Sequence, residues 1–277
     1  MNTDRIPLAG VIGNPVAHSL SPRLHKHWLR RLALPGDYVP LHVGKDSLAA
    51  VIRALPQMGF VGVNLTIPHK VAVMALADHI TDRATLIGAA NTLIFRKDGK
   101  IHADNTDGYG FIANLRQGAP DWRPDAGPAA VLGAGGAARA VIAALIDAGV
   151  DEILLANRTR PKSEALKSEF GQRITIVDWV QAGNMLEDAA TVVNTTSLGM
   201  TGAAEFRVPL DGLQKGATVT DLVYTPLDTH LLQAARAAGC VTVDGLGMLL
   251  HQAVPAFERW FGVRPEVDET TRAAVLR

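Results

Sequence analysis

The sequence predicts an α/β protein whose parallel sheets are covered by helices on both faces. Along the 277 residues, short runs of apolar and β-branched residues alternate with longer stretches at helical spacing. The short runs are apolar almost throughout, which is typical of parallel strands that are buried on both sides. One of them, Ala129–Leu132, leads into a glycine-rich turn and an alanine-rich helical stretch, as in nucleotide-binding units.

The periodicity gives expected bounds for the main elements. Strands are expected over Leu8–Ile12, Tyr38–Val43, Gly62–Thr66, Thr92–Phe95, Ala129–Leu132, Ile153–Ala156, Ile174–Val177, Val192–Asn194, Thr218–Leu222 and Val241–Val243. Helices are expected over Pro22–Leu34, Ser47–Gln57, Lys70–Ala77, Gly108–Gln117, Gly136–Ala148, Pro161–Phe170, Thr229–Ala238 and Leu246–Phe261. Pro255 falls inside the last helix, so a kink or break is expected there.

Composition excludes several classes of protein. Hydrophobic residues make up 48% and charged residues 19%, which excludes a disordered chain. The 27 basic and 27 acidic residues cancel, so we expect no nucleic-acid partner. No window approaches the roughly 18 apolar residues of a membrane span, and no signal peptide is evident. With Cys240 as the one cysteine, these features predict a cytoplasmic protein that has no membrane partner.

A linker rich in proline and glycine divides the chain. Residues 118–128 hold three prolines and two glycines, and a strong strand follows at Ala129. The covalent hinge is expected slightly earlier, around Asp104–Gly108, and the last helices are expected to rejoin the first domain. We therefore divide the chain into residues 1–106, residues 107–241 and residues 242–277.

The glycine-rich turn has the pattern G-x-G-x-x-A, formed by Gly133, Gly135 and Ala138. Gly133 permits the tight turn, Gly135 lets a pyrophosphate approach the backbone, and Ala138 keeps the helix close to the strand. A purely structural turn is the alternative, but the strand before it and the helix after it favour dinucleotide binding.

The end of the next strand indicates which dinucleotide is bound. Asn157 stands about 20 residues after the glycine turn, where an NAD-selective unit has an acidic residue for the ribose hydroxyl. Arg158, Arg160 and Lys162 follow at once and could hold a 2′-phosphate. The alternative is a solvated turn with Thr159 as helix cap. We favour NADP(H) as the cofactor.

Polar residues in the first half form a second group. Ser19 and Ser21 precede a helix and could receive a carboxylate, although Ser21-Pro22 also fits an ordinary helix cap, which the residues alone favour. Asn64 and Thr66 share one face at the carboxyl end of a strand, where α/β sheets bind ligands.

Lys70 and Asp107 are a candidate acid–base pair. A lysine in a partly dry site can donate or accept a proton, and a nearby carboxylate can orient it. Lys70 as a surface lysine, Asp107 as a helix cap and Asn91 as a turn residue are the structural alternatives. Nucleophile elbow, Walker A, zinc-protease and C-x-x-C motifs are missing, and the scattered histidines predict no metal site.

Taken together, the motifs resemble the shikimate dehydrogenase family along nearly the whole chain. They are Gly13–Pro22, Asn64–Lys70, Gly88–Thr92, Asp104–Gly108, Gly133–Ala138, Asn157–Thr159, Asn194–Met200, Asp221–Pro226 and Asp244–Gln252, all in family order. The resemblance implies two α/β domains around a cleft: an N-terminal substrate domain with a mainly parallel sheet and a Rossmann-type NADP-binding domain. Lys162 stands where the family often has arginine.

The resemblance implies a reversible NADPH-dependent reduction of 3-dehydroshikimate to shikimate, and it reverses the preference for Ser21 as a mere cap. It makes Lys70 and Asp107 the catalytic pair. The implied substrate-binding residues are Ser19, Ser21, Asn64, Thr66, Asn91, Tyr224 and Gln252, with Asp107 also holding a ring hydroxyl. The implied cofactor-binding residues are Gly133, Gly135, Gly136, Ala137, Ala138, Asn157, Arg158, Thr159, Arg160, Lys162, Thr195, Leu222, Gly245 and Met248.

Two alternatives stay open at this point. One is a quinate/shikimate dehydrogenase of broader specificity, and the other is a non-catalytic NADP-binding regulatory module. The presence of Lys70 and Asp107 argues against the second. The expected partner is a small-molecule substrate, and the chain is expected to be a monomer or a homodimer.

Overall fold

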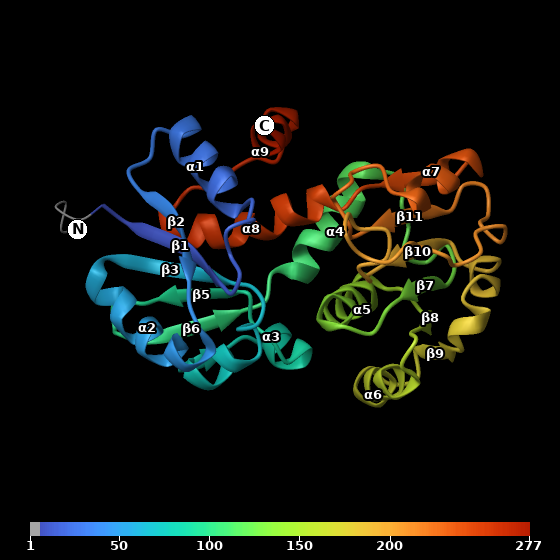
Figure 1. Ribbon diagram of the computed structural model, residues 1–277, viewed down its shortest axis with the longest axis horizontal. Helices are drawn as coiled ribbons and strands as arrows, with labels where there is room; N and C mark the ends of the chain where they lie inside the picture. The colour runs from blue at the N-terminus through green and yellow to red at the C-terminus, as the bar shows by residue number, and fades with distance from the viewer. Residues whose placement is uncertain (1–5) are drawn as a thin grey trace. The chain divides into compact units, whose positions relative to one another are not determined.

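Two six-stranded sheets organise the computed structural model, which describes residues 6–277 (Figure 1). Each sheet lies in its own compact unit. The first unit comprises the chain up to Thr106 together with Leu250–Arg277, and the second comprises Asp107–Leu249. The predicted α/β class, with mostly parallel strands, is confirmed.

The first unit has the strand order β2-β1-β3-β5-β6-β4. Its strands are β1 (Leu8–Gly13), β2 (Asp37–His42), β3 (Phe60–Leu65), β4 (His79–Ile80), β5 (Thr92–Phe95) and β6 (Ile101–Asp104). β1 runs parallel to β2 and β3, and β4 runs parallel to β6, whereas β5 is antiparallel to both of its neighbours. A short turn closed by the Arg96 N–H and the Lys100 carbonyl joins β5 to β6, too short for a parallel crossover.

The helices of the first unit differ from the expected ones in several places. They are α1 (Ser21–Arg31), α2 (Leu48–Ala54), α3 (Asp82–Ile87), most of α8 (Leu246–Phe261) and α9 (Glu269–Leu276). The helix expected over Lys70–Ala77 is wrong, because only a 3₁₀ segment, Ala72–Leu76, forms there. The helix expected over Ser47–Gln57 is shortened to α2, with 3₁₀ turns on both sides. α8 continues unbroken through Pro255.

The second unit is a fully parallel sheet of order β12-β11-β10-β7-β8-β9. Its strands are β7 (Ala129–Leu132), β8 (Ile153–Ala156), β9 (Ile174–Val177), β10 (Thr191–Asn194), β11 (Thr218–Asp221) and β12 (Val241–Val243). Its helices are α4 (Asp107–Gly118), α5 (Gly136–Ala148), α6 (Arg160–Phe170) and α7 (His230–Ala237). This is the doubly wound order of dinucleotide-binding folds, and the order reverses between β7 and β10.

Alternating residues of β7 face two separate cores in this unit. Ala129 and Val131 pack with residues of α4, α5 and α6, whereas Ala130 and Leu132 pack with residues of α7. The strand is therefore buried on both faces, as its continuous apolar run predicts (Figure 1).

In the first unit, α8 packs directly on the sheet through Trp260. The Trp260 indole N–H donates to the Leu93 carbonyl at 3.1 Å, and the ring lies against β3 at Gly62. A Cβ at Gly62 would lie 2.0 Å from Trp260 Nε1 and 2.2 Å from the Leu93 oxygen. The absence of a side chain at Gly62 is therefore what lets α8 approach the sheet.

Gly62→Ala is expected to lower the free energy of unfolding by about 2–4 kcal/mol, because both neighbours would have to shift. Gly44→Ala is the matched control, since a Cβ there meets nothing within 4 Å and φ is −69°. That variant is expected to be neutral or slightly stabilising. Urea denaturation measures both, and equal stabilities would contradict the close packing of Trp260.

Candidate active site

In the first unit, three strand ends meet at a buried polar cluster. The antiparallel register pairs Asn64, near the end of β3, with Thr92, the first residue of β5, and pairs Thr92 with Asp104, the last residue of β6. Asn64, Thr92 and Asp104 are each at most 5% exposed. Buried polar groups need hydrogen-bond partners, and the Asn64 side-chain amide donates to the Thr92 hydroxyl across the two strand ends.

Asn91 is the centre of this cluster. Its Nδ2 donates to Thr106 Oγ1 at 3.0 Å and to Gln252 Oε1 at 3.1 Å. Its Oδ1 accepts the Thr106 N–H and the Thr92 hydroxyl, both at 3.0 Å. Its carbonyl accepts the Asn64 side-chain amide at 3.1 Å. Asn64, Asn91 and Gln252, all expected to bind substrate, are thus brought together from β3, the start of β5 and α8.

Tyr38 is a member of the cluster that the sequence analysis missed. Its hydroxyl donates to Asn64 Oδ1 at 2.7 Å and is also hydrogen-bonded to Ser21. Burial raises the pKa of Tyr38 well above its usual value, so the hydroxyl keeps its proton. The ring stacks on His25 with centroids 4.0 Å apart, and burial lowers the pKa of His25 to about 3. Tyr38 links Ser21 to Asn64.

The two serines have different local roles from those expected. Ser21 does not cap α1, because it is the first helical residue and its side chain turns to Tyr38. Ser19 Oγ instead accepts the Ser21 N–H at 3.3 Å. The alternative interpretation of Ser21 as an ordinary cap is therefore wrong. Ser21 is 7% exposed, whereas Ser19 is partly exposed.

The segment after β3 holds Lys70 in a tight turn beside the cluster. The Lys70 carbonyl accepts the Ala90 N–H at 2.8 Å, one residue before Asn91. His69, which is fully buried, donates Nε2–H to the Val43 carbonyl at 2.8 Å. Thr66 lies just past the end of β3, and its N–H donates to the Ile12 carbonyl. The turn fixes the backbone of Lys70 while its side chain stays partly exposed.

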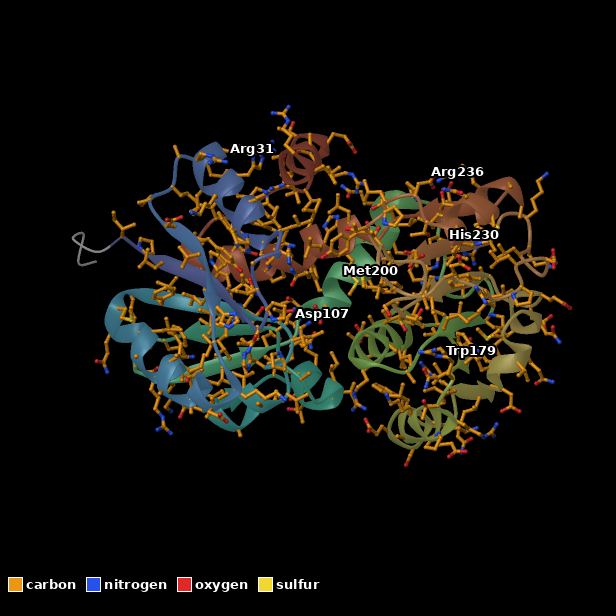
Figure 2. The ribbon with its side chains drawn as sticks, viewed as in Figure 1. Arg31, Asp107, Trp179, Met200, His230 and Arg236 are labelled. Carbon is orange, nitrogen blue, oxygen red and sulfur yellow. The ribbon has the colours of Figure 1, made fainter. Side chains whose placement is uncertain are left out.

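The cluster also contains an ion pair between Arg83 and Asp104. Asp104 accepts from Arg83 Nε at 2.6 Å and from Arg83 Nη2, Thr81 Oγ1 and the Asn105 N–H. Burial raises the pKa of Asp104, but these donors outweigh it, and the pKa lies below its usual value. Asp107, the first residue of α4, begins the second unit three residues later (Figure 2).

In the second unit, the glycine turn sits at the point where the strand order reverses. Gly133 has φ +105°, and a Cβ there would lie 2.6 Å from Thr195 Oγ1, so only glycine fits. Thr195 donates both its N–H and its hydroxyl to the Leu132 carbonyl, at 2.9 and 2.7 Å. A Cβ at Gly245 would meet the Leu222 carbonyl at 2.5 Å. Thr195 thus lies against the glycine turn, and Gly245 lies against Leu222 just past the end of β11.

The turn fits a dinucleotide phosphate on two counts. A Cβ at Gly135 or at Gly136, where α5 begins, would meet nothing within 4 Å, so the backbone borders open space. Ala138 is fully buried, which lets α5 lie close to the sheet. Free N–H groups at a helix start, bordering open space, suit an anion.

Asn157 holds the turn from the neighbouring strand. Its Oδ1 accepts the Ala134 N–H at 3.2 Å, and its Nδ2 donates to the Thr159 carbonyl at 2.9 Å. A neutral amide thus occupies the position where a carboxylate would repel a 2′-phosphate.

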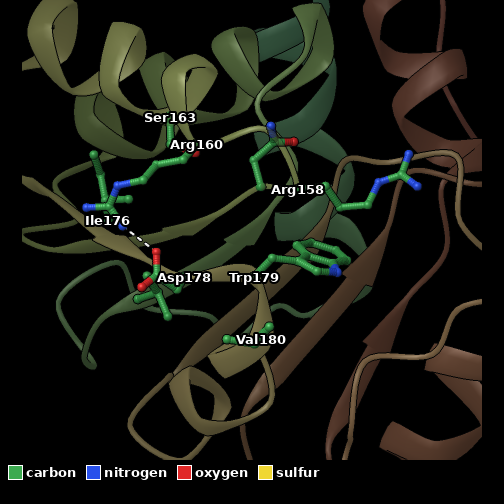
Figure 3. Close-up of a pocket in the computed structure, with 9 residues that line it drawn as sticks. Arg158, Arg160, Ser163, Ile176, Asp178, Trp179 and Val180 are labelled. Carbon is green, nitrogen blue, oxygen red and sulfur yellow. Dashed lines mark hydrogen bonds and ion pairs between the residues drawn. The ribbon is translucent and has the colours of Figure 1, made fainter.

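The three cations after β8 are not equivalent. Arg160 Nε donates to Glu164 Oε1 at 3.0 Å and its Nη1 pairs with Asp178, so its charge is compensated. Within residues 6–277, no ion pair is recorded for Arg158 or Lys162. Arg158 and Arg160 line one pocket, with the Arg160–Asp178 pair at one end and Arg158 beside Trp179 at the other (Figure 3).

Asp221 is a buried carboxyl that sequence analysis did not assign. It is fully buried and accepts from Asn194 Nδ2, the Val223 N–H and Thr229 Oγ1 at 2.8–3.0 Å. Burial raises its pKa in spite of these donors. It anchors the segment that carries Leu222 and Tyr224. Burial also raises the pKa of Tyr224, whose hydroxyl therefore stays a donor.

The described part of the chain lacks two further features. Within residues 6–277, no three His, Cys, Asp or Glu side chains come together as a metal site. In the same part of the chain, every helix is too short or too polar to cross a bilayer.

Comparison with known proteins gives matches along the whole chain. Residues 11–93 match the shikimate dehydrogenase substrate binding domain, residues 125–201 the shikimate / quinate 5-dehydrogenase family and residues 245–275 the shikimate 5'-dehydrogenase C-terminal domain. A shikimate dehydrogenase (NADP(+)) of Cereibacter sphaeroides is 71% identical over 272 residues, 98% of each chain. One of Paracoccus denitrificans is 67% identical over 98% of this chain and 96% of its own.

Solved structures give the same result. Shikimate 5-dehydrogenase from Thermus thermophilus, in complex with NADP(H) and shikimate, has a TM-score of 0.86 and 37% identity, covering 96% of this chain and 98% of its own. Quinate dehydrogenase from Corynebacterium glutamicum, in complex with NAD, has a TM-score of 0.91 and 32% identity, covering 99% of each.

Tyr38→Phe is expected to lower the free energy of unfolding by about 1–3 kcal/mol, because Asn64 Oδ1 would lose its buried donor. Phenylalanine keeps the stack on His25, so the loss reports the hydroxyl alone. Urea denaturation at fixed pH measures it, with Tyr38→Leu as the variant that loses ring and hydroxyl together. An unchanged stability for Tyr38→Phe would show that the link is dispensable.

Proposed function

The chain belongs to the shikimate dehydrogenase family, and from this premise we propose that it catalyses the reversible NADPH-dependent reduction of 3-dehydroshikimate to shikimate in aromatic amino-acid biosynthesis. The observation that carries the proposal is the 71% identity to an NADP-dependent relative over 98% of both chains, because it spans both units. Residues 1–106 then take the substrate and residues 107–241 take the cofactor. Residues 242–277, which belong to the first unit from Leu250 onward, support the substrate part.

Substrate recognition falls to the polar cluster and the residues around it. Ser19 and Ser21 receive the carboxylate, together with the Tyr224 hydroxyl, whose raised pKa keeps it a donor. The ring hydroxyls are held by Asn64, Thr66, Asn91, Asp107 and Gln252. Because the Asn64 amide also donates to the Asn91 carbonyl and to the Thr92 hydroxyl, the site is held in shape before substrate arrives.

Lys70 and Asp107 carry the proton chemistry. When bound, NADPH supplies the hydride that reduces the ketone carbon. The Lys70 ammonium stabilises the negative charge that develops on the ketone oxygen and donates the proton to it. Asp107 orients that ammonium. In the reverse direction, Lys70 accepts the proton from the hydroxyl of shikimate.

The residues present fit NADP(H). Gly133, Gly135, Gly136, Ala137 and Ala138 would hold the pyrophosphate, with Thr195, Leu222, Gly245 and Met248 lining the same edge of the sheet. Arg158, Lys162, Thr159 and Asn157 would hold the 2′-phosphate. Arg160 contributes less, because Glu164 and Asp178 already compensate its charge. A cytoplasmic location and a monomeric or homodimeric state complete the proposal.

A quinate dehydrogenase is the second candidate, favoured by the TM-score of 0.91 to the enzyme of Corynebacterium glutamicum. That neighbour was solved with NAD, whereas Asn157 and the cations after it favour the 2′-phosphate of NADP in this chain. We therefore place shikimate and NADP(H) first.

Lys70→Ala is expected to lower kcat for shikimate oxidation by about 10²–10⁴-fold, because the proton acceptor is lost. The dissociation constant for shikimate, measured by calorimetry, is expected to change by only a few-fold. Lys100→Ala, an exposed lysine of the same unit, is the control and should keep full turnover. Near-normal kcat in Lys70→Ala would remove this residue from the mechanism.

Arg158→Ala is expected to raise KM for NADP⁺ by about 10-fold or more, since a charge-assisted contact to phosphate is lost. KM for NAD⁺ should change much less. Arg160→Ala is the matched comparison and should show the smaller NADP⁺ effect, because its charge is already paired. Equal effects of Arg158→Ala on both cofactors would refute the 2′-phosphate assignment.

A further inference from the structure

The pocket beside Arg158 has an apolar side that the proposed 2′-phosphate contacts do not use. It is lined by Ile176, Val177, Trp179 and Val180, the ends of β9 and the turn after it (Figure 3). Val180 is 92% exposed, and Trp179 is half-buried. One part of the indole packs on the core of the second unit, so the ring is anchored while it borders the pocket.

The order of the strands determines which part of a bound nucleotide faces this apolar side. β8 and β9 are parallel neighbours, paired from Ile153 with Ile174 to Ala156 with Val177. Their carboxyl ends therefore open on the same edge, with Asn157 and Arg158 after one and Asp178 and Trp179 after the other. For a nucleoside whose ribose is held after β8, the end of β9 is therefore the neighbouring surface available to its base.

The charges around the pocket favour the same orientation of a bound nucleotide. The far end of the pocket is closed by the Arg160–Asp178 ion pair, which is neutral overall and places a carboxylate there. A phosphate is attracted more strongly to Arg158, which has no recorded ion pair within the described residues, than to this charge-compensated end. An uncharged flat ring suits the apolar surface of Trp179 and Val180 instead.

We propose that Trp179 is the surface on which the adenine ring of the cofactor stacks, while Arg158 meets the 2′-phosphate. This deepens, and rests on, the NADP(H)-dependent function proposed above. Because NADP and NAD share the adenine, Trp179 contributes to the affinity for both, whereas Arg158 distinguishes between them. Stacking of a base on an aromatic side chain is sequence-tolerant and strong enough to measure.

Adenosine 2′-monophosphate is the probe, titrated into the full chain while tryptophan fluorescence is recorded. Wild-type emission is expected to be quenched, and Trp179→Phe is expected to lose the quench while calorimetry still detects binding. Trp122→Phe is the matched control and should keep it, since that indole is bonded to Thr191 at 2.9 Å, away from this pocket. A quench that persists in Trp179→Phe would overturn the proposal.

Kinetics give a second readout. Trp179→Ala is expected to raise KM for NADP⁺ and for NAD⁺ by the same factor, about 5- to 30-fold, with kcat nearly unchanged. An effect on NADP⁺ alone, or on neither cofactor, would contradict stacking. If Trp179→Ala fails to fold, the fluorescence titration of Trp179→Phe decides whether adenine stacks on this residue. Probe binding does not need turnover, so a failure to oxidise shikimate would count against the proposed function and leave the adenine subsite standing.

Discussion

The first unit depends on the hydrogen bonds that the Asn91 side chain makes. Asn91 is 2% exposed. Its side-chain amide is hydrogen-bonded to Thr92, Thr106 and Gln252, and its backbone carbonyl accepts the Asn64 amide. An amide buried so deeply is costly unless every donor and acceptor is used. The residue therefore ties β3, β5, the end of β6 and α8 into one arrangement. The side chains that we propose to bind substrate and the Lys70 turn lie around that arrangement, so the proposed recognition and the stability of the unit depend on the same hydrogen bonds.

In the second unit, the candidate site is formed mainly by backbone groups rather than by side chains. The parallel sheet reverses its order between β7 and β10, and the turn after β7 must pass close to Thr195. Gly133 makes that approach possible, and the open space at Gly135 and Gly136 leaves N–H groups available to an anion. Asn157 then braces the turn from the next strand. The proposed phosphate binding thus follows from topology. The proposed selectivity for the 2′-phosphate rests on Arg158, because the neighbouring Arg160 is already paired with carboxylates.

Many strand bounds and the glycine turn are predictable from the sequence because their sequence patterns are local. The strands from Thr92, Ala129, Ile153, Ile174 and Val241 have the predicted bounds, and the glycine turn was recognised by its pattern. Long-range pairing was not predictable. β4 has only two residues, and β6 lies next to β5 because of an antiparallel turn. Tyr38 belongs to the site through hydrogen bonds to Asn64, which is 26 residues away, and to Ser21. The Arg160–Asp178 pair likewise spans 18 residues, so the sequence alone does not distinguish Arg160 from Arg158.

The most direct test of the account is the absorbance of reduced nicotinamide, followed with shikimate or quinate, each in the presence of NADP⁺ or NAD⁺. We expect rapid reduction with shikimate and NADP⁺, and much slower reduction in the other three combinations. Preferred turnover of quinate or of NAD⁺ would contradict the assigned specificity. Absence of turnover in all four, with adenosine 2′-monophosphate still bound, would contradict the catalytic role of Lys70 and make the chain an NADP-binding module.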